Sequence, residues 1–221
     1  DGTANANGTG VYVAPTGSAT VEASTVAGNT GPGVFLDGPG STVVDCGIGV
    51  VPGGQALRNG GFGVLIDDAS PAAVNVVGRP GRGNQIAFNG RDGVRIQGLG
   101  VVRANAIFDN ADLGLSVALD ASPPPDVTAV VDDGLSTRVT GSVQLPTPDD
   151  ASLTIDVYRN LACDPSGAGE GRVWLESFDV EAIGGAAIFD HPLTTDVADG
   201  AVLTFTSTRQ GSLTSEFSAC V

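Results

Sequence analysis

The chain has 221 residues, a length that suits one or two domains. Its 25 acidic residues outnumber 10 basic ones, all arginine, and the net charge of −15 argues against nucleic acid or anionic lipid as a partner. No apolar run reaches the roughly 18 residues that a transmembrane helix needs, so we expect no transmembrane segment. The chain has no methionine, even at position 1, which indicates a processed mature form or a fragment of something longer.

A repeated motif runs through the first half of the chain. An asparagine is followed four residues later by glycine, and the glycine by apolar residues at alternate positions, in four places: Asn29/Gly33, Asn59/Gly63, Asn89/Gly93 and Asn110/Gly114. The glycines are 30, 30 and 21 residues apart (63−33, 93−63, 114−93), and a weaker copy surrounds Asn7 and Gly10. Repeats too short to bury a core alone must stack, which predicts a solenoid.

The strands of this solenoid follow from period-two alternation after each glycine. Inward positions are predicted at Val34/Leu36, Val64/Ile66, Val94/Ile96 and Leu115/Val117, and outward ones at Phe35, Leu65, Arg95 and Ser116. A second strand is expected to end three residues before each asparagine, with Val26, Ala56, Ile86 and Ile107 pointing inward. Because stacked coils lie about 4.8 Å apart, the four asparagines Asn29, Asn59, Asn89 and Asn110 are predicted to bond amide to amide as a ladder. The alternative is an accidental Asn/Gly-rich loop.

These repeats, together with the closing segment 103–115 (RANAIFDNADLGL), resemble the right-handed parallel β-helix repeats of secreted bacterial and archaeal proteins, the superfamily that includes the pectate lyases. The resemblance covers about residues 1–121 and implies a short right-handed parallel β-helix in an all-β chain. A fold of this kind does not fix function.

Acid/base chemistry is not expected on this coil. Related polysaccharide enzymes place acidic and basic residues on one outward face, whereas the equivalent row here is Phe35, Leu65, Arg95 and Ser116, so we assign no catalytic residues. Asp37 and Asp67 occupy equivalent positions (33+4, 63+4), with Asp68 alongside. We expect a solvated acidic turn and no cofactor; the alternatives are a Ca²⁺ site or, more remotely, a glycosidase pair.

Two coils are longer than the third (30 residues against 21), and the excess is assigned to Cys46–Gly54 and Gly78–Gly83. Loops on a rigid scaffold commonly carry binding groups. The candidate contact surface therefore comprises these loops and the outward apolar residues: Phe35, Leu65, Ile48, Val50, Val51, Arg79 and Arg82. The alternative is loop length without a role.

A domain boundary is predicted at residues 121/122, before three consecutive prolines that cannot donate ladder hydrogen bonds and favour a stiff linker. Residues 122–221 then show about seven alternating strands, which predicts an immunoglobulin-like β-sandwich. The strands are expected at 127–131, 137–145, 153–158, 173–180, 186–189, 202–207 and 215–221.

Segments 158–171 (YRNLACDPSGAGEG) and 214–220 (TSEFSAC) are similar to the carboxy-terminal sandwich that follows β-helix repeats in secreted bacterial proteins. This resemblance implies a disulfide between Cys163 and Cys220 and an extracellular or cell-surface location, and a loop cysteine beside a last-strand cysteine agrees with it. Two free buried thiols are the alternative. Cys46 is interpreted as a small buried residue, with an intermolecular link or a reactive thiol as alternatives.

Two functions fit this sequence. The favoured one is a non-enzymatic extracellular structural module, a surface or fibre subunit that adheres or self-assembles as a homo-oligomer or filament through coil ends and loops. The alternative is a carbohydrate-binding or polysaccharide-modifying β-helix domain with a polysaccharide partner, against which the low aromatic content (5%, one Trp) argues. The first coil has no evident cap, which suits either strand addition from another subunit or a fragment of a longer monomeric β-helix.

Overall fold

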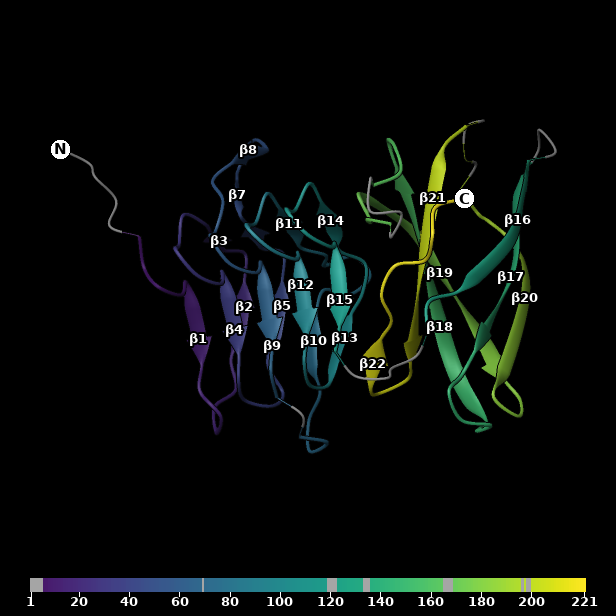
Figure 1. Ribbon diagram of the computed structural model, residues 1–221, viewed down its shortest axis with the longest axis horizontal. Helices are drawn as coiled ribbons and strands as arrows, with labels where there is room; N and C mark the ends of the chain where they lie inside the picture. Colours follow the sequence, from purple (N-terminus) through teal and green to yellow (C-terminus); the bar gives the residue numbers. More distant parts are fainter. Residues whose placement is uncertain are drawn as a thin grey trace.

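The computed structural model describes residues 6–68, 70–118, 123–132, 136–164, 169–195, 197 and 200–221. These residues form strands and turns only, and among them there is no helix capable of spanning a membrane. The chain is all-β: a coil of stacked parallel strands is followed by antiparallel sheets (Figure 1). The predicted domain boundary at 121/122 lies outside the described residues and stays a prediction.

Three parallel sheets make up the coil, and among the described residues the first contains five short strands and the other two contain four each. The first sheet contains, in order, β1 (Val11–Val13), β4 (Val34–Leu36), β9 (Val64–Ile66), β12 (Val94–Ile96) and β15 (Leu115–Val117). The second contains β2 (Thr20–Glu22), β5 (Thr42–Val44), β10 (Asn75–Val77) and β13 (Gly100–Val102). The third contains β3 (Thr25–Val26), β6 (Gly47–Ile48), β11 (Gln85–Ala87) and β14 (Ala106–Phe108). All three sheets have parallel pairing, as a β-helix requires; the right hand of the coil stays a prediction.

The coil interior is filled by the alternating apolar residues of the first sheet. Val34, Val64 and Val94 stand in register and are fully buried, as are the next inward residues of the same strands. The last coil differs from the prediction: Ser116 is buried and Val117 is only half-buried. The burial of Ser116 is explained by Asp92, because the Ser116 hydroxyl donates a hydrogen bond to the buried Asp92 carboxylate.

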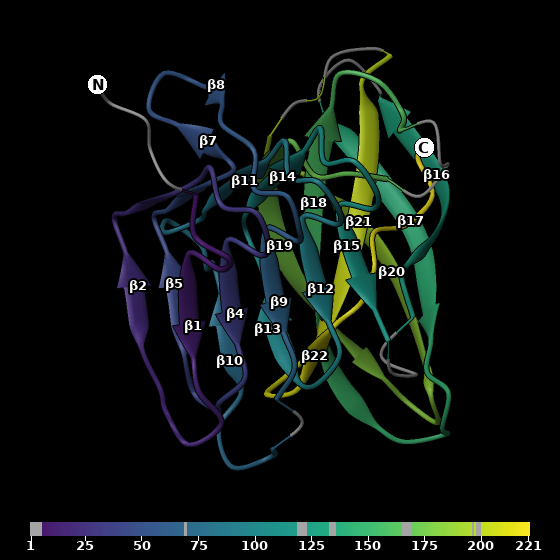
Figure 2. The same ribbon diagram turned by 60° about the vertical axis from the view of Figure 1, so that its left-hand side comes forward.

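The second strand of the second coil was predicted in the wrong place. Ile48 in β6, not Ala56, stands in register with Ile86 and points into the core. Ile48 precedes Asn59 by 11 residues, whereas Ile86 precedes Asn89 by three, so the second coil holds eight extra residues after its inward residue. Those residues form an antiparallel hairpin of β7 (Val50–Val51) and β8 (Gln55–Ala56) that stands off the coil (Figure 2).

Sharp turns between the sheets rely on residues in the left-handed backbone region. Five of them are not glycine: Ala23, Asp45, Phe88, Ala104 and Asp109, with φ between 48° and 60°. Left-handed backbone costs an L-residue about 1–2 kcal/mol relative to its preferred conformation. The coil therefore carries strain at its corners that the stacked core must offset.

Two antiparallel sheets follow the coil and pack face to face. One has the order β16 (Asp126–Asp132), β17 (Thr137–Gln144), β20 (Ala186–Pro192); the other has the order β19 (Val173–Ala182), β18 (Ala151–Asn160), β21 (Val202–Arg209), β22 (Leu213–Thr214). Six of the seven strands overlap the predicted ranges, and the residues after β22 continue along β21 through backbone hydrogen bonds up to Val221. This order places the first, second and fifth strands opposite the third, fourth, sixth and seventh, an immunoglobulin-like sandwich in which the fourth strand joins the second sheet.

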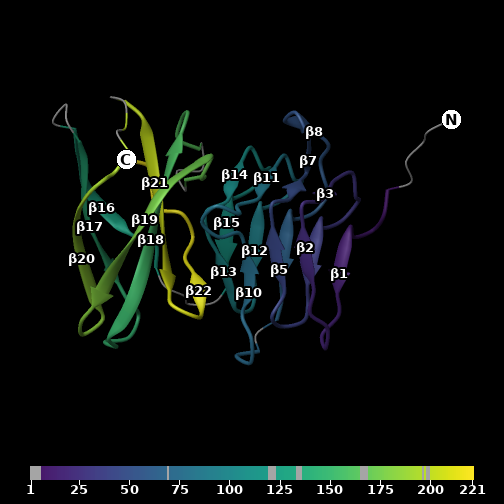
Figure 3. The ribbon, with the colours of Figure 1, turned by 180° about the vertical axis from the view of Figure 1, so that it is seen from behind.

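The sandwich seals the last coil (Figure 3). Each sheet of the coil ends against it: Val102 N–H donates to Thr214 Oγ1 (2.9 Å), Val117 N–H donates to Glu216 Oε1 (2.9 Å), and Ile107 forms a two-way backbone bridge with Gly171. Three sandwich residues belong to the apolar core of the coil: Tyr158, Leu213 and Phe217. The strand edges that a solenoid exposes at its end are therefore covered at this end.

A buried ion pair fixes this junction. Asp156 in β18 is fully buried and accepts hydrogen bonds from Arg103 Nε (2.7 Å), Trp174 Nε1 (3.0 Å) and Ser177 Oγ (2.5 Å). A buried carboxylate is tolerated only when its charge and lone pairs are satisfied. The contact joins a turn of the coil to the central strand of the sandwich sheet that faces it.

Candidate functional site

The structure stacks the four predicted asparagines into one buried ladder. The amide nitrogen of Asn29 donates to Asn59 Oδ1 (2.8 Å), that of Asn59 to Asn89 Oδ1 (2.9 Å) and that of Asn89 to Asn110 Oδ1 (2.9 Å). The amide nitrogens of the last three also donate to backbone carbonyls of neighbouring coils. The ladder thus ties each turn to the coils on both sides and is a structural element, not a binding site.

A second ladder at another corner was missed from the sequence. Asn84 Nδ2 donates to Asn105 Oδ1 (2.8 Å), and Cys46 N–H donates to Asn84 Oδ1 (2.9 Å). The Cys46 thiol lies within hydrogen-bonding distance of the carbonyls of Val44 (3.2 Å) and Val21 (3.5 Å). The thiol therefore stands where the neighbouring coils place an asparagine amide. The sequence does contain a pattern that could have predicted this second ladder: an asparagine stands five residues before Asn89 and another five residues before Asn110 (89−84, 110−105).

Glu170 of the sandwich lies beside the last residue of the first ladder. Its pKa is raised by burial, while the backbone amides of Asp109 and Asn110 act in the opposite direction. Its Oε1 atom is buried and has no hydrogen-bond partner among the described residues.

The arm, which we define as residues 49–58, is the most prominent departure from the coil. Ile48, predicted as part of the contact surface, is fully buried in the coil core and cannot contact a partner. Val50 is also buried, because it packs with Ala87 and Phe108 in a small separate cluster, whereas Val51 is half-buried. The exposed part of the arm runs from Pro52 to Arg58.

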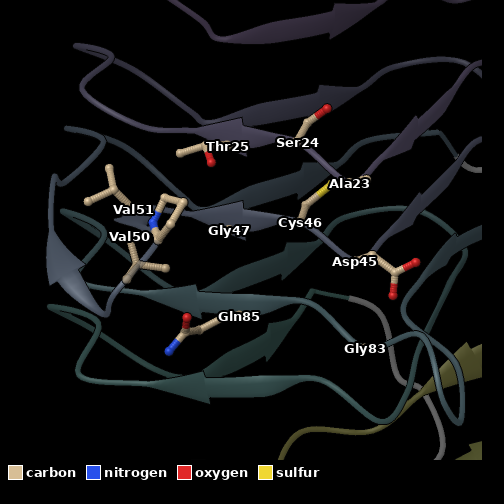
Figure 4. A pocket seen from close by; sticks show the side chains of 11 residues that line it. Ala23, Ser24, Thr25, Asp45, Cys46, Gly47, Val50, Val51, Gly83 and Gln85 are labelled. Atoms are coloured by element: carbon tan, nitrogen blue, oxygen red, sulfur yellow. The ribbon is translucent and has the colours of Figure 1, made fainter.

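A groove opens between the arm and the outer face of the third sheet (Figure 4). It has a volume of about 480 Å³; its polar floor includes Thr25 and Gln85, and its wall carries Val50, Val51 and Pro52. Gly47 lies between them, and a Cβ atom there would stand 2.8 Å from the Val50 carbonyl oxygen, so only glycine lets the arm fold back over the sheet. Burial raises the pKa of the Cys46 thiol at the groove edge and keeps it protonated.

One arginine lies next to this groove. Arg82, in the turn between β10 and β11, pairs with Asp45 at the groove edge (2.5 Å) and with Glu22 (3.1 Å). Arg79 in the same turn is exposed and does not line the groove. Of the seven predicted contact residues, Val50 and Val51 line the groove, and Phe35 and Leu65 are half-buried on another sheet.

A second hollow lies on the other side of the arm, and we call it the Phe88 notch. It has a volume of about 520 Å³ and is lined by Leu57, Arg58, Phe88 and Asp109, with Ala56, Asn89 and Ala111 at its margins. Phe88 meets Phe108 edge to face (centroids 6.0 Å apart), and Arg172 covers the outer side of Phe108 at 4.0 Å while pairing with Asp109 (2.6 Å). The notch is an apolar hollow with one exposed guanidinium, Arg58, that forms no ion pair with the described residues.

Phe88 is an unusual residue for its backbone. Its φ of 60° is left-handed, and the equivalent turns of other coils use Gly28 and Asp109, which tolerate this conformation better. A phenylalanine here costs about 1–2 kcal/mol of backbone strain. Nothing in the local sequence marks Phe88, the residue directly before Asn89, as left-handed.

The outward row of the first sheet carries no acid/base set. Tyr12 and Phe35 pair with ring centroids 5.2 Å apart, and Leu65, Arg95 and buried Ser116 follow. The Tyr12 hydroxyl donates to Asp37 (2.7 Å), and this bond raises the pKa of Tyr12.

Asp67 lies on the coil next to Asp37 but is exposed, and Asp68 accepts from the Ser70 amide (3.2 Å). No group of three His, Cys, Asp or Glu side chains suited to a metal ion occurs in the described residues. The candidate calcium ligands Asp37, Asp67 and Asp68 are thus not gathered into such a group.

The cysteines divide between the two parts of the chain. Cys163 and Cys220 form a disulfide with a Cα–Cα distance of 5.9 Å, and Cys46 is free and buried. The bond joins the loop after β18 to the final residues of the sandwich and closes 57 residues of sequence separation. A disulfide of this kind persists in oxidising compartments.

Comparison of the chain with protein-family profiles and with curated proteins finds no match. Stacked parallel sheets followed by an antiparallel sandwich define its class, an all-β chain compatible with a β-helix protein. The finer assignment to the pectate-lyase-like superfamily rests on the sequence resemblance alone.

Proposed function

We propose that this chain is a non-enzymatic extracellular structural module, a surface or fibre subunit that adheres or self-assembles through the arm and the hollows beside it. The arm is the single observation that carries the proposal. Three other coils turn from the third sheet to the ladder asparagine with two residues, and the second coil uses ten. Insertions on a rigid scaffold are where binding surfaces commonly arise.

Other features agree with this proposal. The outward row of the first sheet offers aromatic, aliphatic and single basic side chains, which suit contact with another surface better than proton transfer. The disulfide of the sandwich favours export. The ion pair between Arg103 and the buried Asp156 joins the coil to the sandwich, a useful property in a load-bearing subunit.

Removal of the arm tests the proposal. Deleting residues 50–57 and changing Arg58→Gly leaves two residues before Asn59, as in the neighbouring coils, with glycine at the left-handed position. We expect a protein that still unfolds cooperatively but no longer sediments as an oligomer, and no longer adheres to a surface that the native protein binds. The control, Val131→Ser, changes an exposed residue of the sandwich strand β16 and should keep assembly. An armless variant that assembles like the native protein, or native protein that neither assembles nor adheres, would refute the proposal.

A carbohydrate-binding role is the second candidate, and the paired rings of Tyr12 and Phe35 favour it, since sugars stack on exposed aromatic faces. Tyr12 is 55% exposed, and Asp37 beside it supplies a hydrogen-bond acceptor. Binding and cleavage assays on acidic and neutral polysaccharides separate the two functions. Binding that Tyr12→Ala abolishes, while the armless variant retains it, would favour the carbohydrate role.

A further inference from the structure

Charge is divided unequally along the chain. Residues 1–121 contain six arginines and 10 acidic residues, a net charge of −4 (6−10), whereas residues 122–221 contain four arginines and 15 acidic residues, a net charge of −11 (4−15). The coil is thus the less acidic half, and its exposed Arg58 has no carboxylate partner among the described residues. Both halves are negative, so net charge alone attracts neither to the other, and an attractive contact must come from local groups such as Arg58.

The Phe88 notch has the chemistry to accept an apolar tip that is flanked by carboxylates. Its base is formed by the Phe88 ring and by Leu57, which is 50% exposed, and Arg58 stands at its rim. The one acidic residue of the notch, Asp109, is already neutralised by Arg172 at 2.6 Å. The charge left for a ligand is therefore that of Arg58.

A segment of the same chain matches this description. The turn between β19 and β20 presents Ile183, 76% exposed, on the glycine pair Gly184–Gly185 with φ of 61° and 85°. Asp150 accepts the Gly184 amide hydrogen (2.8 Å), and Glu181 is exposed two residues before Ile183. No arginine or histidine occurs within residues 145–158 or 174–190. We call residues 149–150, Glu181 and residues 183–185 together the acidic turn.

We propose that the Phe88 notch of one copy receives the acidic turn of a second copy, with Ile183 in the hollow and Glu181 beside Arg58. Within one chain the two surfaces are far apart, because the arm stands above the coil and the acidic turn lies at the lower end of the sandwich (Figure 1). The contact is therefore between unlike surfaces of different copies, and such contacts generate an open chain of subunits unless the rotation closes a ring. This inference rests on the proposed self-assembly.

A charge exchange tests it by sedimentation velocity at low and moderate salt. Arg58→Glu alone places like charges across the contact, as does Glu181→Arg alone, and each variant should associate at least about tenfold more weakly than the native chain. An equimolar mixture of the two should associate as the native chain does, because each notch then meets a turn of opposite charge. Arg159→Glu and Asp126→Arg change the same charges at other exposed positions and should have little effect.

A variant that removes the exposed apolar side chain of Ile183 tests the same contact independently of charge. Ile183→Ser removes no buried contact, so thermal unfolding should be unchanged while association weakens about tenfold. Native association that is insensitive to Arg58→Glu and Ile183→Ser, or a mixture that fails to restore it, overturns this contact and leaves the proposed function standing. Native protein that stays monomeric throughout also overturns this contact, and it overturns the proposed function only if the protein does not adhere either.

Discussion

Replacing Asn89 with alanine removes a member of the asparagine ladder whose side chain makes four hydrogen bonds. Its amide nitrogen donates to Asn110 Oδ1 (2.9 Å) and to the carbonyls of Ile48 (3.2 Å) and Ala87 (3.3 Å), and its Oδ1 accepts from Asn59 (2.9 Å). The side chain is 1% exposed, so water cannot replace these partners without opening the coil.

The magnitude follows from what each partner keeps. Asn59 Nδ2 retains the Val26 carbonyl, and Asn110 Oδ1 retains the backbone amide of residue 89, so both lose one bond of two at about 1 kcal/mol each. The carbonyls of Ile48 and Ala87 lose longer bonds, at a further cost of about 0.5 kcal/mol each. The total is about 3 kcal/mol, or a fall in Tm of about 6–12 °C for a chain of this size.

The assay is thermal and denaturant unfolding of Asn89→Ala beside Asn7→Ala. Asn7 is exposed and takes part through its backbone carbonyl only, so its substitution should stay within about 0.5 kcal/mol of the native value. Equal midpoints for the two variants would show that amide bonds between coils do not stabilise the solenoid.

Three further outcomes are expected. Changing both Cys163 and Cys220 to serine should lower the free energy of unfolding by about 4 kcal/mol, since the disulfide closes a loop with a sequence separation of 57. Recovery of both cysteines as free thiols from the native protein would show that the disulfide is absent. Ala23→Gly should raise the free energy of unfolding by about 0.5 kcal/mol, because relief of the left-handed strain at φ 48° exceeds the entropy cost of glycine. The control Ala14→Gly relieves no such strain and should lower the free energy of unfolding. A decrease in both variants would show that the turn at Ala23 is unstrained. Burial opposes ionisation of Glu176, but hydrogen bonds from the Thr194 hydroxyl and amide, among others, prevail and lower its pKa. Its folded pKa thus lies below the unfolded one, and its stabilisation is present above about pH 4.5 and lost as pH falls through the folded value; Glu176→Gln should therefore lower Tm at pH 7 and flatten its decline in acid, and an unchanged acid profile would exclude this carboxylate as a contributor.

The repeated features of the coil were accessible from sequence because each is local. The spacing of asparagine and glycine places the first sheet, and alternation identifies Val64 and Ile66 as inward residues. The strand of the third sheet in the second coil was predicted wrongly from its distance to Asn59, because an insertion separates Asn59 from Ile48. The segment Val51-Pro52-Gly53-Gly54-Gln55 has the composition of a hairpin turn and could have revealed the insertion.

Contacts between distant parts of the chain were not accessible in the same way. Arg103 and Asp156 are 53 residues apart, and neither has a local pattern that distinguishes it from a surface charge. Tyr158 looked like one more alternating strand residue, yet it belongs to the core of the coil. The contact surface was only partly predictable for a related reason: burial of Ile48 and exposure of Leu57 depend on how the arm folds back.

The disulfide also determines how this chain would respond to mechanical tension. A pull applied at Val221 passes through Cys220 to Cys163 and enters the central strand β18 directly, bypassing the residues between the two cysteines. With a separation of 57 residues, roughly 190 Å of contour length is withheld from extension while the bond is intact. β18 also contacts the coil through the Asp156–Arg103 ion pair. The thiol–disulfide state would thus set how far the sandwich can extend under load.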